Sequence, residues 1–144
     1  MLISEQIAHY FDDPFFAGGL ACSGRPLAVW AIVATLDAMK EEKVVENAAT
    51  IGNGVLRSGL ETLAEKHALI GEVRGRGMFQ ALELVTNRKS KTPVAAANMG
   101  AIKSALVNAG LLPFVVENRI HVVPPCTISA AEVQKGLAIF DEVL

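Results

Sequence analysis

The stretch Ile70-Gly-Glu-Val-Arg-Gly-Arg-Gly-Met-Phe-Gln-Ala-Leu-Glu-Leu-Val85 decides how this chain folds. Two apolar runs, 70–74 and 78–85, flank the glycine-rich bend 75–77, and this arrangement is typical of two short strands around a tight reversal. Glycine allows such a reversal because it carries no Cβ atom. We therefore expect a strand pair at this point of the chain.

A second strand pair is indicated at 111–116 and 119–123. Glu117-Asn118 between the two runs is a candidate tight turn. Pro124-Pro125 prevents the second strand from continuing, because proline has no backbone N–H to donate. These signals predict a second hairpin-like pair.

Helices are expected after each pair. Polar residues 87–92 indicate a loop, and Pro93 starts a predicted helix that runs to Asn108 and is closed by a glycine. The last helix has the clearest start, because Ser129 and Glu132 have the reciprocal spacing of a capping box. Its apolar face is then formed by Val133, Leu137, Phe140 and Leu144.

Two helices are also expected before the first strand pair. Pro26 opens the segment 27–39, which is apolar nearly all round, so we expect it to be buried on most sides. A long amphipathic helix follows from Val44 to near His67. Its glycines at 52, 54 and 59 each cost up to about 1 kcal/mol relative to alanine unless close packing compensates.

The expected order of elements is therefore ααββαββα, an α+β fold with a small antiparallel sheet covered by helices. Residues 1–25 carry turn signals and no sustained period, so we interpret them as an irregular lead-in. We assign residues 26–144 to one α+β domain, because a chain of 144 residues fits a single domain.

The composition excludes several classes of function. With 13 basic and 15 acidic residues and no basic run, the chain lacks the charge pattern of a nucleic-acid-binding or membrane-surface protein. Its longest nearly apolar stretch, 26–36, is shorter than the about 20 residues that a membrane-spanning helix needs. Glu5 does not fit the basic start of a signal peptide, so we predict a cytoplasmic protein.

Metal binding and disulfide bonding are not indicated. Cys22 and Cys126 lie far apart with no metal-ligand spacing around either, so we interpret both as reduced thiols and predict no metal site. Hydrophobic residues make up 51% of the chain and charged residues only 19%. This balance predicts that another domain or subunit covers some of the apolar surface.

Three segments form an ordered set: Gly18-Gly-Leu-Ala-Cys-Ser-Gly-Arg-Pro-Leu-Ala28, Glu72-Val-Arg-Gly-Arg-Gly77 with Glu83-Leu84, and Arg119-Ile-His-Val-Val-Pro-Pro125. Together with the capped last helix, they resemble the C-terminal domain of class III aminotransferases of fold type I, over essentially the whole chain. The resemblance implies a homodimeric enzyme that uses pyridoxal 5'-phosphate (PLP) to move an amino group from an amine or amino acid to a 2-oxo acid. It also implies a large cofactor-binding domain upstream.

The lysine that binds PLP in that family is not recognisable here. In the family it lies on the large domain, as does the acidic partner of the pyridine nitrogen. The lysines of this chain lie mostly in polar or helix-surface contexts, where a solvated charge is the ordinary interpretation: Lys40, Lys43, Lys66, Lys89, Lys91, Lys103 and Lys135. We therefore assign no catalytic residue, and we expect the chain alone to be inactive.

The loop 18–25 is the candidate cofactor-binding segment, with Ala21, Cys22 and Ser23 at the phosphate edge of the neighbouring subunit's cofactor. This role is implied by the resemblance, in which a threonine and adjacent backbone reach the phosphate. Ala21 stands at the threonine position and offers no hydroxyl, so contact would fall to backbone N–H groups, to Ser23 or to the following helix N-terminus. The alternative is a glycine-bearing loop that simply enters a helix.

Arg119 and His121 are the candidate substrate-binding residues. They are two apart on a predicted strand and so share a face. The resemblance implies that an arginine at the position of His121 binds the substrate carboxylate, while only Arg119 here has a guanidinium suited to that task. The alternative is a strand arginine paired with a nearby acid.

Arg74 and Arg76 lie in the glycine-rich bend. They could bind an anion or have a purely structural role, and we favour the structural role.

Two functions of different class remain. The first is the C-terminal portion of a class III aminotransferase. The alternative is a non-catalytic binding or dimerisation module derived from that family. An independent hydrolase is disfavoured, because Ser23-Gly24 lacks the context of a nucleophile elbow.

Overall fold

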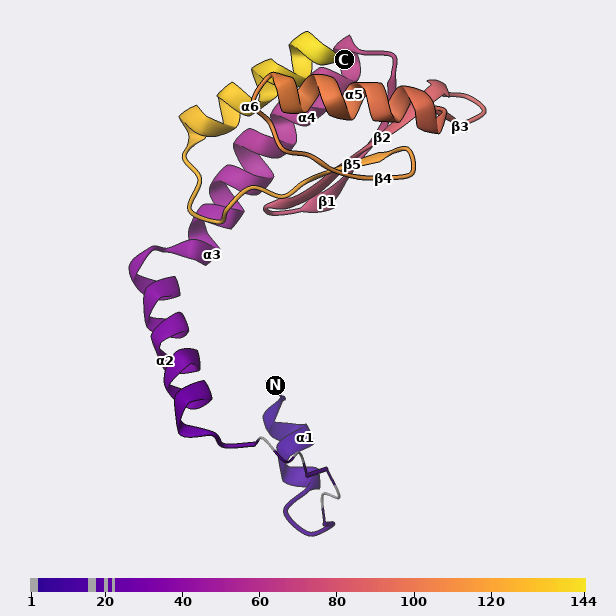
Figure 1. Cartoon of the computed structure of the whole chain (residues 1–144). Coiled ribbons are helices and arrows are strands. Elements are labelled where there is room, and N and C mark those ends of the chain that lie inside the picture. The colour runs from indigo at the N-terminus through magenta and orange to yellow at the C-terminus, as the bar shows by residue number, and fades with distance from the viewer. Residues whose placement is uncertain (1–2, 16–17, 20, 22) are drawn as a thin grey trace. The chain divides into compact units, whose positions relative to one another are not determined.

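The computed structural model describes residues 3–15, 18–19, 21 and 23–144 (Figure 1). The chain divides into two compact units, Met1–Asp37 (unit 1) and Ala38–Leu144 (unit 2). Unit 1 contains α1 (Glu5–Tyr10) and most of α2 (Pro26–Glu41). The division falls inside α2 rather than at its start, and the assignment of residues 26–144 to one domain stays a prediction.

Unit 2 holds the sheet and the helices that cover it. Its helices are α3 (Val44–Asn47), the π-helix η1 (Ala48–Leu56), α4 (Arg57–Lys66), α5 (Ala96–Asn108) and α6 (Ala130–Val143). Its strands are β1 (Ile70–Arg76), β2 (Phe79–Asn87), β3 (Thr92–Pro93), β4 (Phe114–Val116) and β5 (Arg119–Val122). The predicted α+β class with a small antiparallel sheet is confirmed.

The sheet is antiparallel throughout, in the order β1-β2-β5-β4, with β3 paired to β2. The predicted strand pair around the glycine-rich bend is confirmed as β1 and β2, which reverse at Gly77 with a φ of +56°. The second predicted pair is confirmed as β4 and β5, and Glu117 takes the left-handed conformation between them with a φ of +55°.

Alternation along the strands gives the sheet two faces with different environments. Leu82 and Ile120 pair across β2 and β5 and are fully buried. In Figure 1, α4, α5 and α6 lie on one side of the sheet, and their apolar side chains join this core. The buried core cluster is Leu56, Leu60, Leu63, Ile70, Met78, Leu82, Leu84, Val94, Met99, Leu106, Ile120, Val133 and Phe140.

The opposite face of the sheet is the open face. It consists of the residues that alternate with the core positions, which the strand register places in cross-strand rows. One row is Arg74, Ala81, His121 and Phe114, and the next is Glu72, Glu83, Arg119 and Val116. Both candidate substrate-binding residues therefore lie on the open face.

The capping box predicted for the last helix is confirmed. The Ser129 hydroxyl accepts a hydrogen bond from the backbone N–H of Glu132, and the Glu132 carboxylate accepts one from the backbone N–H of Ser129. The hydrogen bonds from the Ser129 hydroxyl and backbone lower the pKa of Glu132 below its ordinary value. This reciprocal pair fixes where α6 begins, after the Pro124-Pro125 segment.

The long helix predicted from Val44 to near His67 exists, but its middle is wider than an α-helix. Residues 48–56 form the π-helix η1, in which Asn53 accepts a 2.7 Å hydrogen bond from the backbone N–H of Gly77. A Cβ atom at Gly52 would lie 2.4 Å from the carbonyl carbon of Gly77. The glycine thus allows the helix to approach the β1–β2 turn, which explains its place inside a helix.

Four expectations need correction. The lead-in contains the helix α1, which Ser4 caps by accepting a hydrogen bond from Ile7. The short strand β3 takes Pro93, so α5 begins at Ala96 instead. The segment predicted as a helix from Leu27 forms α2, yet none of its residues is buried, because unit 1 has too little chain to enclose it. The helix predicted from Val44 to near His67 is interrupted by the π-helix η1.

Candidate functional site

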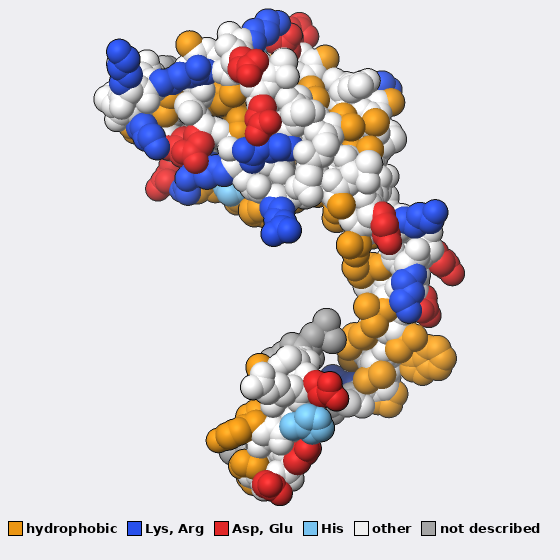
Figure 2. Space-filling view, turned by 180° about the vertical axis from the view of Figure 1, so that it is seen from behind, with side chains coloured by type: hydrophobic (Ala, Val, Ile, Leu, Met, Phe, Trp, Pro, Cys, Tyr) orange, Lys and Arg blue, Asp and Glu red, His pale blue; other side chains and the backbone are white. Residues whose placement is uncertain are grey.

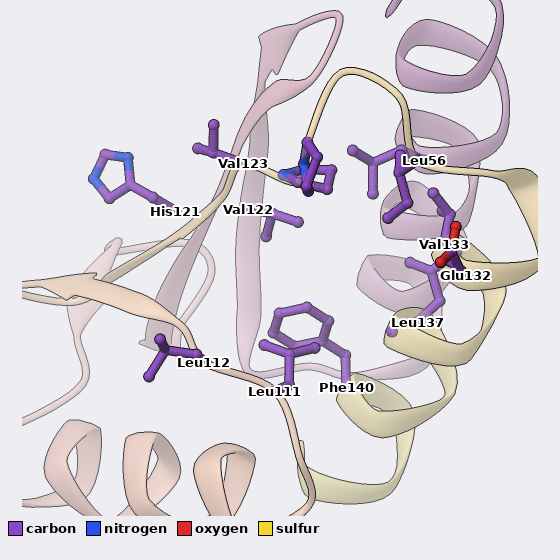
Figure 3. A pocket seen from close by; sticks show the side chains of 14 residues that line it. Leu56, Leu111, Leu112, His121, Val122, Val123, Glu132, Val133, Leu137 and Phe140 are labelled. Atoms are coloured by element: carbon purple, nitrogen blue, oxygen red, sulfur yellow. The ribbon is translucent and has the colours of Figure 1, made fainter. Parts of the chain in front are cut away.

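An apolar cavity of about 290 Å³ lies in unit 2 between β5, α6 and the segments that precede β4 and follow β5. Figure 3 shows Val122 and Phe140 pointing toward this space, and His121 also belongs to its lining. The one carboxylate in its lining, Glu132, is held by the capping box of α6. The polar side chains in its lining are therefore this engaged carboxylate and His121, and Arg119 does not line the cavity.

On the open face, Arg119 is engaged by an acid. Its guanidinium donates a hydrogen bond to the Glu117 carboxylate. The Arg119 Nε atom is buried, and in the described part of the chain it has no hydrogen-bond partner. Arg119 thus shares a face with His121, as expected. Its pairing with Glu117 is the alternative that the sequence left open, a strand arginine paired with a nearby acid.

His121 lies between two phenyl rings. The ring centroids of His121 and Phe114 are 5.4 Å apart, and those of His121 and Phe79 are 6.0 Å apart. Both phenylalanines are largely exposed, Phe79 at 61% and Phe114 at 67%. Phe79 lies opposite Arg76 and Phe114 lies opposite His121, so the two exposed rings flank His121 on the open face. His121 is therefore part of an aromatic cluster on the open face.

The sequence did not single out Phe79 and Phe114. The signal that would find them is the alternation of the strands, which puts residues 79, 81 and 83 on one face and residues 114 and 116 on the same face of the neighbouring strand pair. That inference requires the pairing register of β2, β5 and β4. Register depends on which residues meet across non-consecutive strands, which the sequence pattern alone left open.

Arg74 and Arg76 differ in their partners. The Arg74 guanidinium donates to the Glu83 carboxylate over 2.5 Å. Arg76 is exposed and forms no ion pair with any acid that the structure describes. It lies at the end of β1, opposite Phe79 in the register.

The predicted phosphate edge belongs to unit 1. Ala21 and Ser23 are exposed, and Gly24 takes the left-handed conformation with a φ of +69° just before α2 begins at Pro26. Cys22 lies outside the described residues. The helix start is as predicted, and the cofactor-binding role of Ala21, Cys22 and Ser23 stays a prediction.

No lysine of the chain lies in a protein interior. Each of them is exposed, in a helix surface or loop position: Lys40, Lys43, Lys66, Lys89, Lys91, Lys103 and Lys135.

Within the described ranges, no group of three or more His, Cys, Asp or Glu residues lies close enough to hold a metal ion. None of the described helices is long and apolar enough to cross a membrane.

Comparison with known proteins decides the family, because the family model for class III aminotransferases matches residues 3–144. The chain belongs to the class III aminotransferase family. Among its relatives, the taurine–pyruvate aminotransferase of Rhodobacter capsulatus is 37% identical over 76% of this chain and 22% of the relative. The acetylornithine aminotransferase of Thermosynechococcus vestitus is 33% identical over 99% of this chain and 34% of the relative.

Solved structures of transaminases have the same fold. A PLP-bound amine transaminase from an uncultivated Pseudomonas species has a TM-score of 0.83 and 29% identity, covering 96% of this chain and 33% of its own. The taurine:2-oxoglutarate aminotransferase of Bifidobacterium kashiwanohense, in complex with PLP and glutamate, has a TM-score of 0.82 and 32% identity, covering 98% and 32%. This class III chain thus spans about a third or less of the relatives that it matches.

Proposed function

We propose that this chain is the C-terminal part of an enzyme that uses PLP to transfer an amino group from an amine or amino acid to a 2-oxo acid. The observation that supports the proposal is the match to the class III family over residues 3–144, in a chain that spans only 22% to 34% of the relatives described above. Both of those relatives are aminotransferases by name, and two solved neighbours hold PLP.

The exposure of the lysines supports a chain that does not attach PLP by itself. Covalent attachment of PLP requires a lysine whose amine is desolvated or otherwise activated, and every lysine of this chain is exposed. When bound in the parent enzyme, PLP supplies an electron sink for the amino-transfer chemistry. The lysine and the acid that holds the pyridine nitrogen would come from the upstream domain, so we propose that the chain alone is inactive.

The role proposed for this chain is to form one edge of the substrate pocket. Arg119 and His121 would face the substrate from the open face, with Arg119 exchanging the Glu117 carboxylate for that of the substrate. This exchange costs little, because the Arg119–Glu117 pair is partly exposed and such pairs contribute at most about 1 kcal/mol.

The role proposed for unit 1 is contact with the rest of the enzyme. Ala21, Cys22 and Ser23 would approach the cofactor phosphate of the neighbouring subunit of a homodimer, through backbone N–H groups and the Ser23 hydroxyl. Exposed apolar side chains run along α2 (Figure 2), among them Leu27 at 84% and Trp30 at 73% exposure. We propose that the upstream domain covers this helix.

Incubation with PLP and borohydride tests the inactivity of the isolated chain. After excess PLP is removed, we expect no stable absorbance band of a protein-bound PLP–lysine adduct and no lysine modified on borohydride reduction, as read by peptide mass spectrometry. The parent enzyme with its upstream domain is the positive control. A reduced adduct at a single lysine of the isolated chain would contradict the proposal.

The second candidate is a non-catalytic binding or dimerisation module derived from the family. It is supported by α2, an apolar helix in which no residue is buried. The coding sequence upstream of Met1 separates the two candidates, because only an aminotransferase would have an in-frame large domain with the PLP lysine. A dimer of the chain that binds phosphate-bearing ligands through the loop 18–25 would favour the enzyme; a monomer indifferent to them would favour the module.

A further inference from the structure

The acidic side chains of the open face all have ion-pair partners, whereas one of its basic side chains has none in the described chain. Each of its carboxylates has a basic partner: Glu83 pairs with Arg74, and Glu72 lies 3.8 Å from Lys91. Arg119 is engaged by Glu117 from the adjoining turn. Arg76 alone among the open-face guanidiniums has no ion pair within the part of the chain that the structure describes. This end of the face therefore has an uncompensated positive charge.

Arg76 lines a groove of about 520 Å³ together with Asn53 and Phe79, entirely within unit 2. The Asn53 side-chain oxygen accepts a hydrogen bond from Gly77, and its amide nitrogen has no partner among the described residues. A guanidinium and an amide N–H₂ group thus line the same groove. Two such donors suit a carboxylate, which accepts hydrogen bonds at both oxygens.

Phe79 connects this groove to the aromatic cluster. It lies opposite Arg76 in the register of β1 and β2, and its ring is in contact with that of His121, which in turn contacts Phe114. Val123, 53% exposed, lines the same groove. The groove lined by Arg76 and Asn53 thus adjoins an exposed apolar and aromatic surface.

We propose that Arg76, Asn53, Phe79, His121 and Phe114 form a recognition site for a small carboxylate that carries an aryl group. The carboxylate would be held by Arg76 and the Asn53 amide, and the aryl group would pack on the phenyl rings beside His121. Charge complementarity favours an anionic ligand, because Arg76 is the one charged side chain of this end of the face without an ion pair to any described residue, and it is positive. The site deepens the proposed function, and it rests on that function for its role as part of the substrate pocket.

Binding of phenylacetate to the whole chain tests the site. The chain has only three histidines, so the ring resonances of His9, His67 and His121 can be followed separately by NMR. We expect phenylacetate to shift the His121 resonances in a saturable way and to leave the other two unchanged. Acetate, which lacks the ring, and phenylacetamide, which lacks the charge, should each bind at least about tenfold more weakly.

Matched variants assign the contacts. R76Q should weaken phenylacetate binding about tenfold, because a charge-assisted hydrogen bond is lost. K103Q makes the same change in net charge at an exposed position of α5 and should leave binding unchanged. F79A should also weaken binding, and its exposure means that the fold tolerates the change, which the spectrum of the unliganded variant verifies.

Three results would overturn the inference: no saturable shift of His121, equal binding of phenylacetate and phenylacetamide, or equal loss of affinity in R76Q and K103Q. The outcome is separable from that of the proposed function. Binding to the chain as expected, with no amino transfer by the parent enzyme, would refute the function and leave the site. Amino transfer by the parent enzyme without such binding would refute the site alone.

Discussion

Gly52 lies where the helical run of unit 2 comes closest to the β1–β2 turn. A Cβ atom there would lie 2.4 Å from a backbone carbon of Gly77, whereas a Cβ atom at Gly54 would meet nothing within 4 Å. Backbone cannot move aside as a flexible side chain can. We therefore predict that G52A lowers the free energy of unfolding by about 1–3 kcal/mol through overpacking.

G54A is the matched control, since it makes the same chemical change two residues away. It should leave stability unchanged or raise it by up to about 1 kcal/mol, because alanine is the better helix former. Urea unfolding of both variants measures the difference. Equal effects at the two positions would show that close approach to the turn does not explain Gly52.

At the candidate site, the sequence predicts single positions better than combinations of positions. His121 and Ala21 could be named from the sequence because each occupies a position of a motif that resembles the class III family. Arg76 could be named from the sequence for its charge. That it has no acid partner in the described chain follows only from the structure, in which Glu83 pairs with Arg74, two residues before Arg76 on β1. Phe79 and Phe114 were missed, because their contact with His121 exists only after β2, β5 and β4 are aligned.

At the scale of elements, one carboxylate joins the end of α4 to α6. Asp141 accepts a 2.6 Å hydrogen bond from Lys66 and is 2.7 Å from the His67 ring nitrogen. These contacts, with that of Lys66 the larger, lower the pKa of Asp141 below its ordinary value of 3.8. The folded chain then binds fewer protons here than the unfolded chain, so the contact stabilises the fold fully only above that ordinary value.

We predict that D141N is less stable than the wild type at neutral pH, and that the difference shrinks as the pH falls below 3.8 and through the lowered pKa of the folded chain. Urea midpoints measured across this range give the result. D37N removes an exposed aspartate of α2 that has no ion pair in the described chain, and it should show no such trend. A difference that stays constant with pH would contradict this account of Asp141.

Most elements were predictable because their signals are local. The capping box of α6 and the glycine-rich turn between β1 and β2 each lie within a few residues. The π-helix was not predictable in this way, because the closeness of Gly52 to Gly77 and the bond from Gly77 to Asn53 join segments far apart in the chain. The pairing of β3 with β2 is likewise a tertiary contact. Because Pro93 belongs to β3, α5 begins at Ala96 and not at Pro93 as predicted.

At the scale of the whole molecule, the two units differ in what they bury. Unit 2 encloses a core that includes Leu60, Leu82 and Ile120, all fully buried. In unit 1, no residue of α1 or α2 is buried, although α2 is composed largely of apolar residues. At about 25 cal/mol per Å², covering such a helix would be strongly favourable. The sequence predicted apolar surface in need of cover and a segment 27–39 buried on most sides, but not that this segment is exposed in the chain itself.

Trp30 reports on whether α2 is covered, because it is the only tryptophan of the chain and is 73% exposed. With the chain labelled by fluorotryptophan, we predict a single ¹⁹F resonance that is sensitive to a soluble quencher. Adding the unlabelled upstream domain of the parent enzyme should shift this resonance and protect it, because the proposed contact removes Trp30 from water. L27K places a charge on the same helix and should weaken the effect, whereas L112K changes an equally exposed leucine of unit 2 and should not. An unshifted resonance in a mixture that transfers amino groups would show that α2 is covered by something other than that domain.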